Sequence, residues 1–236
     1  MGTVVRVEGL TKVYGAGEQR VAALDGVSLR IEAGEFVAVM GPSGSGKSTF
    51  MNIIGFLDRQ TAGDYFFEGR DVRELSLDQL ADLRSRKLGF VFQSYNLLPR
   101  TNALENVELP LVYTGIGESK RHEAALTAMR IVGVEALASH LPNQLSGGQQ
   151  QRIAIARALV NDPTLVLADE PTGALDTKTS HDVMRLITRL NLEHGITIVV
   201  VTHERDVAAY ARRVIQFRDG KIESDVPNEP AEKTVS

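Results

Sequence analysis

The chain has 236 residues, of which 43% are hydrophobic, so it is long enough to bury a sizeable core. Its net charge of −4 counts weakly against nucleic acid as the main partner, and the absence of cysteine excludes disulfides and thiolate metal sites. The first residues lack a leader pattern, and the most apolar run is far shorter than the ~20 residues of a membrane-spanning helix. We therefore expect a protein that reaches a membrane only through a partner.

Four apolar, β-branched runs predict strands. They are residues 36–40, 88–92, 164–168 and 196–201. Because these runs are apolar on both faces, they are typical of a parallel sheet covered by helices. In such sheets, ligands bind beyond the carboxyl ends of the strands. Here those ends are followed by a glycine-rich loop, Gln93, the pair Asp169 and Glu170, and His203.

Helical patterns lie between these runs. They are residues 48–54, 76–85, 120–131 and 180–193, the second opened by a Ser-Leu-Asp-Gln capping box and the last followed by Gly195. An Asp-Gly turn predicts a hairpin at residues 217–222, and we expect the polar tail 226–236 to be disordered. Residues 94–159 are interpreted as a helical subdomain inserted into an α/β core of residues 1–93 and 160–225. One continuous fold without a separable lobe is the alternative.

Residues 41–48 form the pattern G-x-x-x-x-G-K-S between a predicted strand and a predicted helix. Glycines let several backbone N–H groups face one anion, and the helix N-terminus adds a favourable dipole. In such a site Lys47 neutralises the β- and γ-phosphates, and the Ser48 hydroxyl binds Mg²⁺. We expect nucleotide contacts from Gly41, Ser43, Gly44, Ser45, Gly46, Lys47, Ser48 and Thr49.

Two carboxylates follow the predicted strand at residues 164–168. We expect Asp169 to bind Mg²⁺ directly or through water. Glu170 is expected to take a proton from the attacking water, a step worth roughly 10²–10⁴-fold in rate. The alternative for Glu170 is a solvated carboxylate that caps the next segment.

A second anion site is predicted at residues 145–152, which read Leu-Ser-Gly-Gly-Gln-Gln-Gln-Arg. Ser146 is a good N-cap, so its hydroxyl and the amides of Gly147 and Gly148 would lie at a helix N-terminus. One chain thus carries two anion-binding ends, Lys47 and Ser146, roughly a hundred residues apart. Either both ends hold one nucleotide within a chain, or two chains each contribute one end, and the spacing does not decide between these.

Taken together and in this order, the motifs over residues 4–225 resemble those of the ABC (ATP-binding cassette) ATPases. The resemblance implies an α/β fold: a P-loop NTPase (RecA-like) core with an antiparallel β subdomain and an inserted helical subdomain. It implies ATP and Mg²⁺ as ligands and an ATP-dependent homodimer arranged head to tail. ATP would then lie between one glycine-rich loop and the other chain's Ser146, Gly147, Gly148 and Gln149.

The same resemblance implies roles for further residues. His203 stands where the family's histidine senses the γ-phosphate and orients the attacking water, and Gln93 where a glutamine reaches Mg²⁺ and that water. Tyr14 matches the aromatic residue on which adenine stacks, with ordinary strand packing as the alternative. Asp176 belongs to the loop 173–176 that crosses the dimer interface and contacts nucleotide, although this loop begins with Gly where the commonest form has Ser.

Shorter strings narrow the resemblance to the MacB and LolD branch of bacterial ABC ATPases. They are Leu57–Arg59, Gly89–Gln93, Asn96–Arg100, Glu105–Leu111 and Pro142–Ser146. This branch implies integral membrane permease subunits, with or without a periplasmic adaptor, docked near residues 95–105 and moving macrolides, peptides, toxins or lipoproteins. The chain would then be cytoplasmic, on the inner face of the cell membrane. A regulatory ATPase of the FtsE type, acting in cell division, is the alternative. A cassette that acts on DNA or ribosomes has little support, because the sequence lacks zinc-binding cysteines and a long coiled coil.

Overall fold

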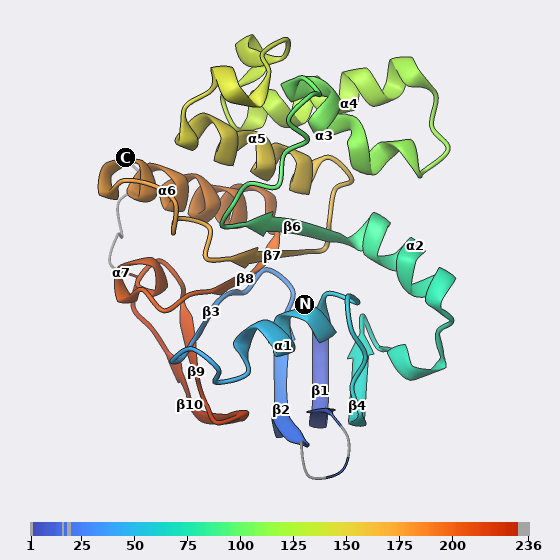
Figure 1. The fold of residues 1–236 in the computed structure, drawn as a ribbon, viewed down its shortest axis with the longest axis vertical. Helices are drawn as coiled ribbons and strands as arrows, with labels where there is room; N and C mark the ends of the chain where they lie inside the picture. Colours follow the sequence, from blue (N-terminus) through green and yellow to red (C-terminus); the bar gives the residue numbers. More distant parts are fainter. Residues whose placement is uncertain (1, 16, 18–19, 231–236) are drawn as a thin grey trace.

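The computed structural model describes residues 2–15, 17 and 20–230. Its strands form a four-stranded antiparallel sheet and a six-stranded sheet, with helices packed around them (Figure 1). The expected α/β architecture with an additional antiparallel sheet is confirmed. None of the helices in these ranges combines the length and the apolar character needed to cross a membrane.

The antiparallel sheet has the order β2-β1-β4-β5. Its strands are β1 (Thr3–Tyr14), β2 (Val21–Glu32), β4 (Ala62–Phe67) and β5 (Arg70–Asp71). Their buried side chains, among them Val5, Leu10 and Tyr65, join one hydrophobic cluster with residues of helix α1 (Lys47–Ile54). This sheet therefore supports the helix that follows the glycine-rich loop.

The six-stranded sheet has the order β10-β9-β3-β8-β7-β6. Its strands are β3 (Phe36–Met40), β6 (Leu88–Phe92), β7 (Leu165–Asp169), β8 (Thr197–Val201), β9 (Arg213–Arg218) and β10 (Lys221–Pro227). All neighbours pair in parallel except β9 and β10. The four strands predicted from apolar runs are confirmed, two of them beginning one residue later than expected.

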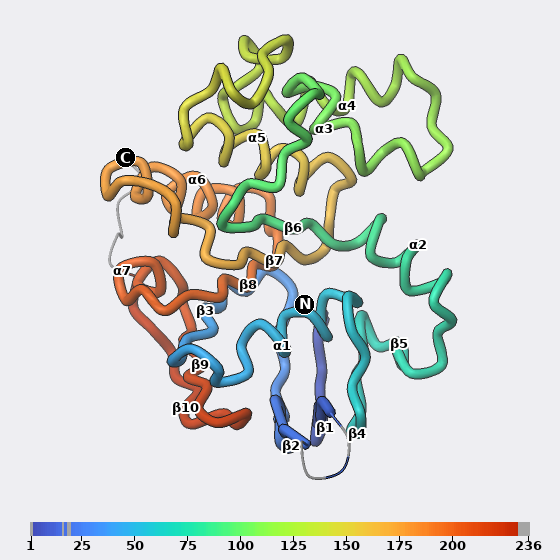
Figure 2. Tube along the Cα trace, in the orientation of Figure 1, coloured from blue at the N-terminus to red at the C-terminus, as the bar shows by residue number. Residues whose placement is uncertain are grey.

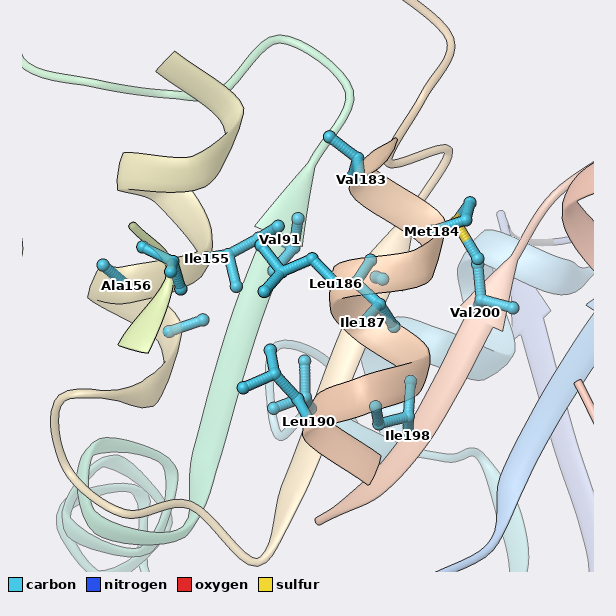
Figure 3. Close-up of a cluster of buried hydrophobic side chains, with 14 of the residues drawn as sticks. Val91, Ile155, Ala156, Val183, Met184, Leu186, Ile187, Leu190, Ile198 and Val200 are labelled. Atoms are coloured by element: carbon cyan, nitrogen blue, oxygen red, sulfur yellow. The ribbon is translucent and has the colours of Figure 1, made fainter. Parts of the chain in front are cut away.

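Opposite faces of the six-stranded sheet belong to different hydrophobic clusters. Val37 and Val39 of β3 pack in the cluster that contains α1 and the antiparallel sheet. Phe36 and Ala38 pack in the other cluster, with helices α5 (Gly147–Leu159) and α6 (Thr177–His194). Figure 3 shows side chains of α6 meeting Val91, Ile198 and Val200 of the sheet. Burial on both faces explains why the strand sequences are uniformly apolar.

Several helices begin and end where local signals place them. Helix α2 (Leu77–Lys87) starts at a complete capping box of Ser76 and Gln79, as predicted. Helix α6 begins three residues earlier than its apolar pattern suggested, because Asp176 caps it, and ends at Gly195 with a φ of 65°. Two short elements follow strands: η2 (Val72–Glu74) leads from β5 into α2, and α7 (Arg205–Ala208) connects β8 to β9.

Most of the chain between β6 and β7 is helical, as the trace in Figure 2 shows. It contains α3 (Ala103–Val112), α4 (Glu118–Ile131), α5, and the short turns η3 (Glu135–Leu137) and η4 (Pro142–Gln144). Helix α5 lies directly against β6. Glycine at position 89 allows this close approach, since a Cβ there would collide with the carbonyl of Ala158. These helices share one hydrophobic cluster with the sheet face below them.

The predicted hairpin at residues 217–222 is confirmed, and its second strand is longer than expected. Strand β10 continues through Val226 and Pro227, which pair with Val214 and Arg213. The expected disorder from residue 226 is therefore wrong for these two residues, and residues 231–236 lie outside the described part. Edge strands tolerate proline and exposed polar residues, which is why this strand lacks a clear sequence pattern.

Candidate nucleotide site

The glycine-rich loop joins β3 to α1 and needs its glycines for both conformation and space. Gly41, Gly44 and Gly46 have φ values of 151°, 78° and 103°. A Cβ on Gly41 would collide with the carbonyl of Phe217, and one on Gly46 with the carbonyl of Ala23. Gly46 is the N-cap of α1 and provides no side-chain cap, so the first N–H groups of the helix have no acceptor from the capping residue.

Lys47 extends across this loop. Its Nζ donates to the carbonyl oxygens of Gly41 and Pro42 at 2.7 and 2.8 Å. Burial lowers the pKa of Lys47, while the charges of Glu170 and Asp169 act in the opposite direction. Beside it, the buried Ser45 hydroxyl has no hydrogen-bond partner. An orphaned hydroxyl and a buried cation in a curled loop fit a phosphate group.

The two carboxylates at the end of β7 lie within electrostatic range of Lys47. Burial raises the pKa of Asp169, and the charge of Glu170 raises it further against the opposing effect of Lys47. Glu170 itself has a φ of 44°, in the left-handed region that non-glycine residues seldom adopt. Strained residues of this kind are often found at functional sites.

Glu170 is held by the end of the neighbouring strand β8. Thr202 Oγ1 donates to Glu170 Oε2 at 2.9 Å, and the backbone N–H of His203 donates to Oε1 at 3.0 Å. His203 Nδ1 lies 2.7 Å from the same Oε1. The hydrogen bond and the charge of Glu170 raise the pKa of His203. The structure thus brings the predicted base and the predicted histidine into direct contact, and it shows that Glu170 does not cap the following segment.

Gln93 follows β6 and lies against the loop that begins at Gly173. A Cβ on Gly173 would come within 2.7 Å of the Gln93 side-chain amide nitrogen. Glycine at the first position of this loop, in place of the more common serine, therefore leaves room for Gln93. Asp176, at the other end of the loop, uses both carboxylate oxygens to hold Thr179 at the start of α6, at 3.1 and 2.6 Å. A nucleotide contact from Asp176 stays a prediction.

The Leu-Ser-Gly-Gly-Gln motif forms the N-terminus of α5. Ser146 and Gln149 make a reciprocal capping box, with bonds of 3.3 and 2.9 Å, which confirms Ser146 as the N-cap. Cβ atoms on Gly147 and Gly148 would collide with the Tyr95 hydroxyl and with Thr179, respectively. A side chain at either position would therefore force Tyr95 or Thr179 to move.

Tyr14 ends β1 with 42% of its surface exposed. Its hydroxyl donates to Asp58 Oδ2 at 2.8 Å, and the side chain of Thr49, on α1, interacts with the same hydroxyl. Tyr14 therefore stands next to the helix that begins at the phosphate loop. A contact between Tyr14 and a nucleotide base stays a prediction.

Two residues of the site were missed by sequence reasoning. Thr202 is fully buried and supplies one of the hydrogen bonds to Glu170. Gln151 is fully buried, and its amide donates to the carbonyl of Pro171 at 2.6 Å, so it ties α5 to the segment directly after Glu170. A hydroxyl residue between a buried strand and a histidine was the available signal for Thr202; nothing distinguished Gln151 from its two neighbouring glutamines.

Comparison with known proteins agrees with this geometry. The family model for the ABC transporter matches residues 24–173. The chain belongs to the ABC transporter family. This family hydrolyses ATP, and the chain is one of its ATP-binding cassettes.

Individual relatives are close over almost the whole cassette. The chain is 51% identical to the ABC transporter ATP-binding protein YknY of Bacillus subtilis (strain 168), covering 98% of this chain and 99% of YknY. It is 53% identical over 97% of its length to the macrolide export ATP-binding/permease protein MacB of Hyphomonas neptunium, but spans only 35% of that protein. A dimeric structure of the ATP-binding cassette MJ0796 in a post-hydrolysis state, bound to ADP and Pi, superposes with a TM-score of 0.86 at 48% identity, covering 94% of this chain and 98% of MJ0796.

Proposed function

We propose that this cassette is the ATP-hydrolysing subunit of a transporter of the MacB and LolD type. It binds Mg-ATP at a head-to-tail dimer interface and drives conformational change in membrane subunits that move macrolides, peptides or lipoproteins. The observation that carries the hydrolytic part of this proposal is the arrangement of Glu170, Thr202 and His203 beside the phosphate loop. The similarity to MacB supports the choice of branch.

Glu170 acts as the general base. Each of its oxygens accepts bonds from Thr202 or His203, and a carboxylate has lone pairs left to accept the proton of a water molecule. The two neighbours hold the carboxylate in one orientation, which is what general-base catalysis requires of a side chain. His203, with 69% of its side chain exposed, orients the attacking water and contacts the γ-phosphate.

The oxygen ligands that Mg²⁺ prefers are present beside the phosphate loop. The Ser48 hydroxyl, the Gln93 amide and the Asp169 carboxylate would hold the ion together with phosphate oxygens of the nucleotide. When bound, Mg²⁺ neutralises charge on the β- and γ-phosphates. The buried Asp169, with its raised pKa, favours its ionised form once a cation is beside it. The orphaned Ser45 hydroxyl is expected to contact a phosphate oxygen.

The placement of the two anion-binding ends supports a nucleotide shared between two copies. Helix α1, which starts at Lys47, packs on one face of the six-stranded sheet, whereas α5, which starts at the Ser146 cap, packs on the other. In Figure 1 the two helices also lie on different sides of that sheet. A nucleotide on Lys47 is therefore more readily completed by Ser146 of a second copy.

Two variants test this function. Glu170→Gln is expected to bind ATP and form a stable dimer. It should hydrolyse ATP roughly a hundredfold or more slowly than the wild type, which is the rate loss typical of removing a general base. Ser146→Arg is expected to bind ATP as a monomer and to lose hydrolysis. Phosphate release and light scattering after gel filtration measure both. Unchanged turnover in Glu170→Gln would remove the base assignment, and full hydrolysis by Ser146→Arg would remove the shared site.

A groove of about 740 Å³ provides a surface for the membrane subunits. Its walls come from α2, β6, the end of α3 and α5. Leu57 and Tyr113 line this groove and are 49% and 81% exposed, so both side chains are accessible to a partner. The groove includes Asn96 of the expected docking region 95–105 but extends to Tyr113. We assign it to a helix of the permease, which would place the cassette on the cytoplasmic face of the membrane, with a periplasmic adaptor as a further member of the complex.

Site-specific crosslinking tests this partner. Because the chain has no cysteine, Tyr113→Cys introduces a single thiol at the groove. In membranes from the native host, this variant is expected to crosslink to an integral permease. Leu192→Cys, at an exposed position of α6, is the matched control and should not crosslink to the permease. Capture of a cell-division membrane protein instead would favour the regulatory FtsE type, and equal crosslinking of both variants would contradict the groove assignment.

A further inference from the structure

A single carboxylate organises the side chains around Tyr14 at the end of β1. Asp58 Oδ2 accepts from the Tyr14 hydroxyl at 2.8 Å, and Asp58 Oδ1 accepts from Lys12 Nζ at 2.6 Å. Lys12 also donates to the carbonyl of Arg59 at 2.6 Å, and its Nζ lies over the Tyr14 ring, 4.9 Å from the centroid. Asp58 thus fixes both the hydroxyl of the ring and the cation over one of its faces.

The charge states of Lys12, Asp58 and Tyr14 keep their hydrogen bonds intact at neutral pH. The Lys12 and Asp58 side chains are only 13% and 31% exposed. Burial by itself would raise the pKa of Asp58, but hydrogen bonds from Lys12, Tyr14 and Arg59 outweigh burial and keep the pKa below its ordinary value. Burial and the bond to Asp58 raise the pKa of Tyr14, so its hydroxyl stays protonated and remains a donor. The contact therefore persists at neutral pH.

The position of the ring connects this cluster to the phosphate loop. Thr49, which interacts with the Tyr14 hydroxyl, directly follows Ser48 on α1. Lys12 covers one face of the ring, yet 42% of Tyr14 is exposed, so ring surface is left for a flat partner. An aromatic side chain in free solution would sample several rotamers, whereas this ring is tethered at its far end.

We propose that Asp58 and Lys12 are positioning residues for the nucleotide base, a role that rests on the proposed function of Tyr14 as the adenine platform. They hold the ring in its binding orientation before ATP arrives, so that binding does not have to order a rotatable side chain. Ordering one such side chain corresponds to about two- to tenfold in affinity. The Leu57–Arg59 string, which sequence analysis treated only as a branch marker, thereby has a function.

The test compares ATP with inorganic tripolyphosphate, which has phosphates but no base. Calorimetric Kd values for both ligands, and KM and kcat for ATP, are measured on the full chain with Tyr14→Phe, Asp58→Asn and the double variant. Each single variant is expected to raise the Kd and KM for ATP about two- to tenfold, with kcat and tripolyphosphate binding little changed. The double variant should lose less than the sum of the two single losses, because Tyr14→Phe removes and Asp58→Asn weakens the same hydrogen bond.

Several results would overturn the positioning role. They are unchanged ATP affinity in both single variants, an additive loss in the double variant, or an equal loss for ATP and tripolyphosphate. Tyr14→Ala separates this role from the platform itself. If Tyr14→Ala binds ATP normally, the adenine platform fails. If it binds weakly while Tyr14→Phe and Asp58→Asn bind normally, only the positioning role fails. Glu135→Gln, which breaks an exposed pair with Arg130 at 2.6 Å, is the control and should bind both ligands like the wild type.

Discussion

Replacing Thr202 with valine tests how the carboxylate of Glu170, the proposed general base, is held. Thr202 is fully buried, and its hydroxyl donates to Glu170 Oε2 at 2.9 Å while accepting from the Glu204 N–H at 3.0 Å. Valine keeps the shape of threonine but removes both bonds. Glu170 would then be held from one side only, by His203. The expected effect is slower hydrolysis with little change in ATP binding.

The size of the effect follows from the type of bond. A hydrogen bond to a charged group contributes about 1.5–3 kcal/mol, and each 1.4 kcal/mol corresponds to about tenfold in rate. If the bond is fully used in the transition state, kcat falls about 10- to 150-fold. The Glu204 N–H also loses its acceptor, the Thr202 hydroxyl. This loss destabilises the fold by about 1 kcal/mol, which is too little to unfold an ordinary domain.

Phosphate release at saturating Mg-ATP gives kcat, and binding of a fluorescent ATP analogue gives the Kd. Thr202→Ser keeps the hydroxyl and is the matched control, expected to retain most of the activity. The reasoning is refuted if Thr202→Val turns over within about twofold of the wild type, or if Thr202→Ser is as slow as the valine variant.

Three further changes probe the contacts around the site. Arg157→Met removes two hydrogen bonds from a partly buried guanidinium, of 2.5 and 2.7 Å, to the carbonyl oxygens of residues 96 and 95. It should lower the free energy of unfolding in urea by about 2 kcal/mol, and an unchanged urea midpoint would contradict this. Gly147→Ala should reduce hydrolysis because its Cβ would lie 2.8 Å from the Tyr95 hydroxyl and 3.2 Å from Cδ2 of Leu175. Tyr95→Phe should partly restore hydrolysis, because it removes the nearer contact and leaves the Tyr95 ring 3.7 Å away. A double variant no faster than Gly147→Ala would contradict a clash with the Tyr95 hydroxyl. The bond and charge of Glu170 raise the pKa of His203, so this pair stabilises the fold fully below the ordinary value of 6.5 and is lost as pH rises through the raised value. The stability difference between wild type and His203→Gln in urea should therefore shrink, not grow, as pH increases.

Local sequence patterns were sufficient to predict most helices and strands, because the start and end of each element depend on residues close to it in the chain. Alternate faces of β3 are both buried, so an apolar run with no alternation predicts it correctly. The capping box at Ser76 and the glycine stop at Gly195 act within a few residues of themselves. The sequence-based prediction ended strand β10 too early. An exposed edge strand has no buried face, so its sequence shows no alternation of apolar and polar residues.

The sequence by itself determined the family, the glycine-rich loop before α1, the helix start at Ser146, and the convergence of Lys47, Asp169 and Glu170 at one edge of the sheet. That convergence follows from parallel strands, whose carboxyl ends meet at the same edge. Only the tertiary structure decided which side chains hold these groups. Thr202 meets Glu170 across 32 positions and Asp58 meets Tyr14 across 44, and the partner in each case is set by how strands order and helices pack. Hydrogen bonds act over about 3 Å, so a pattern along the chain cannot specify partners that only folding brings within reach.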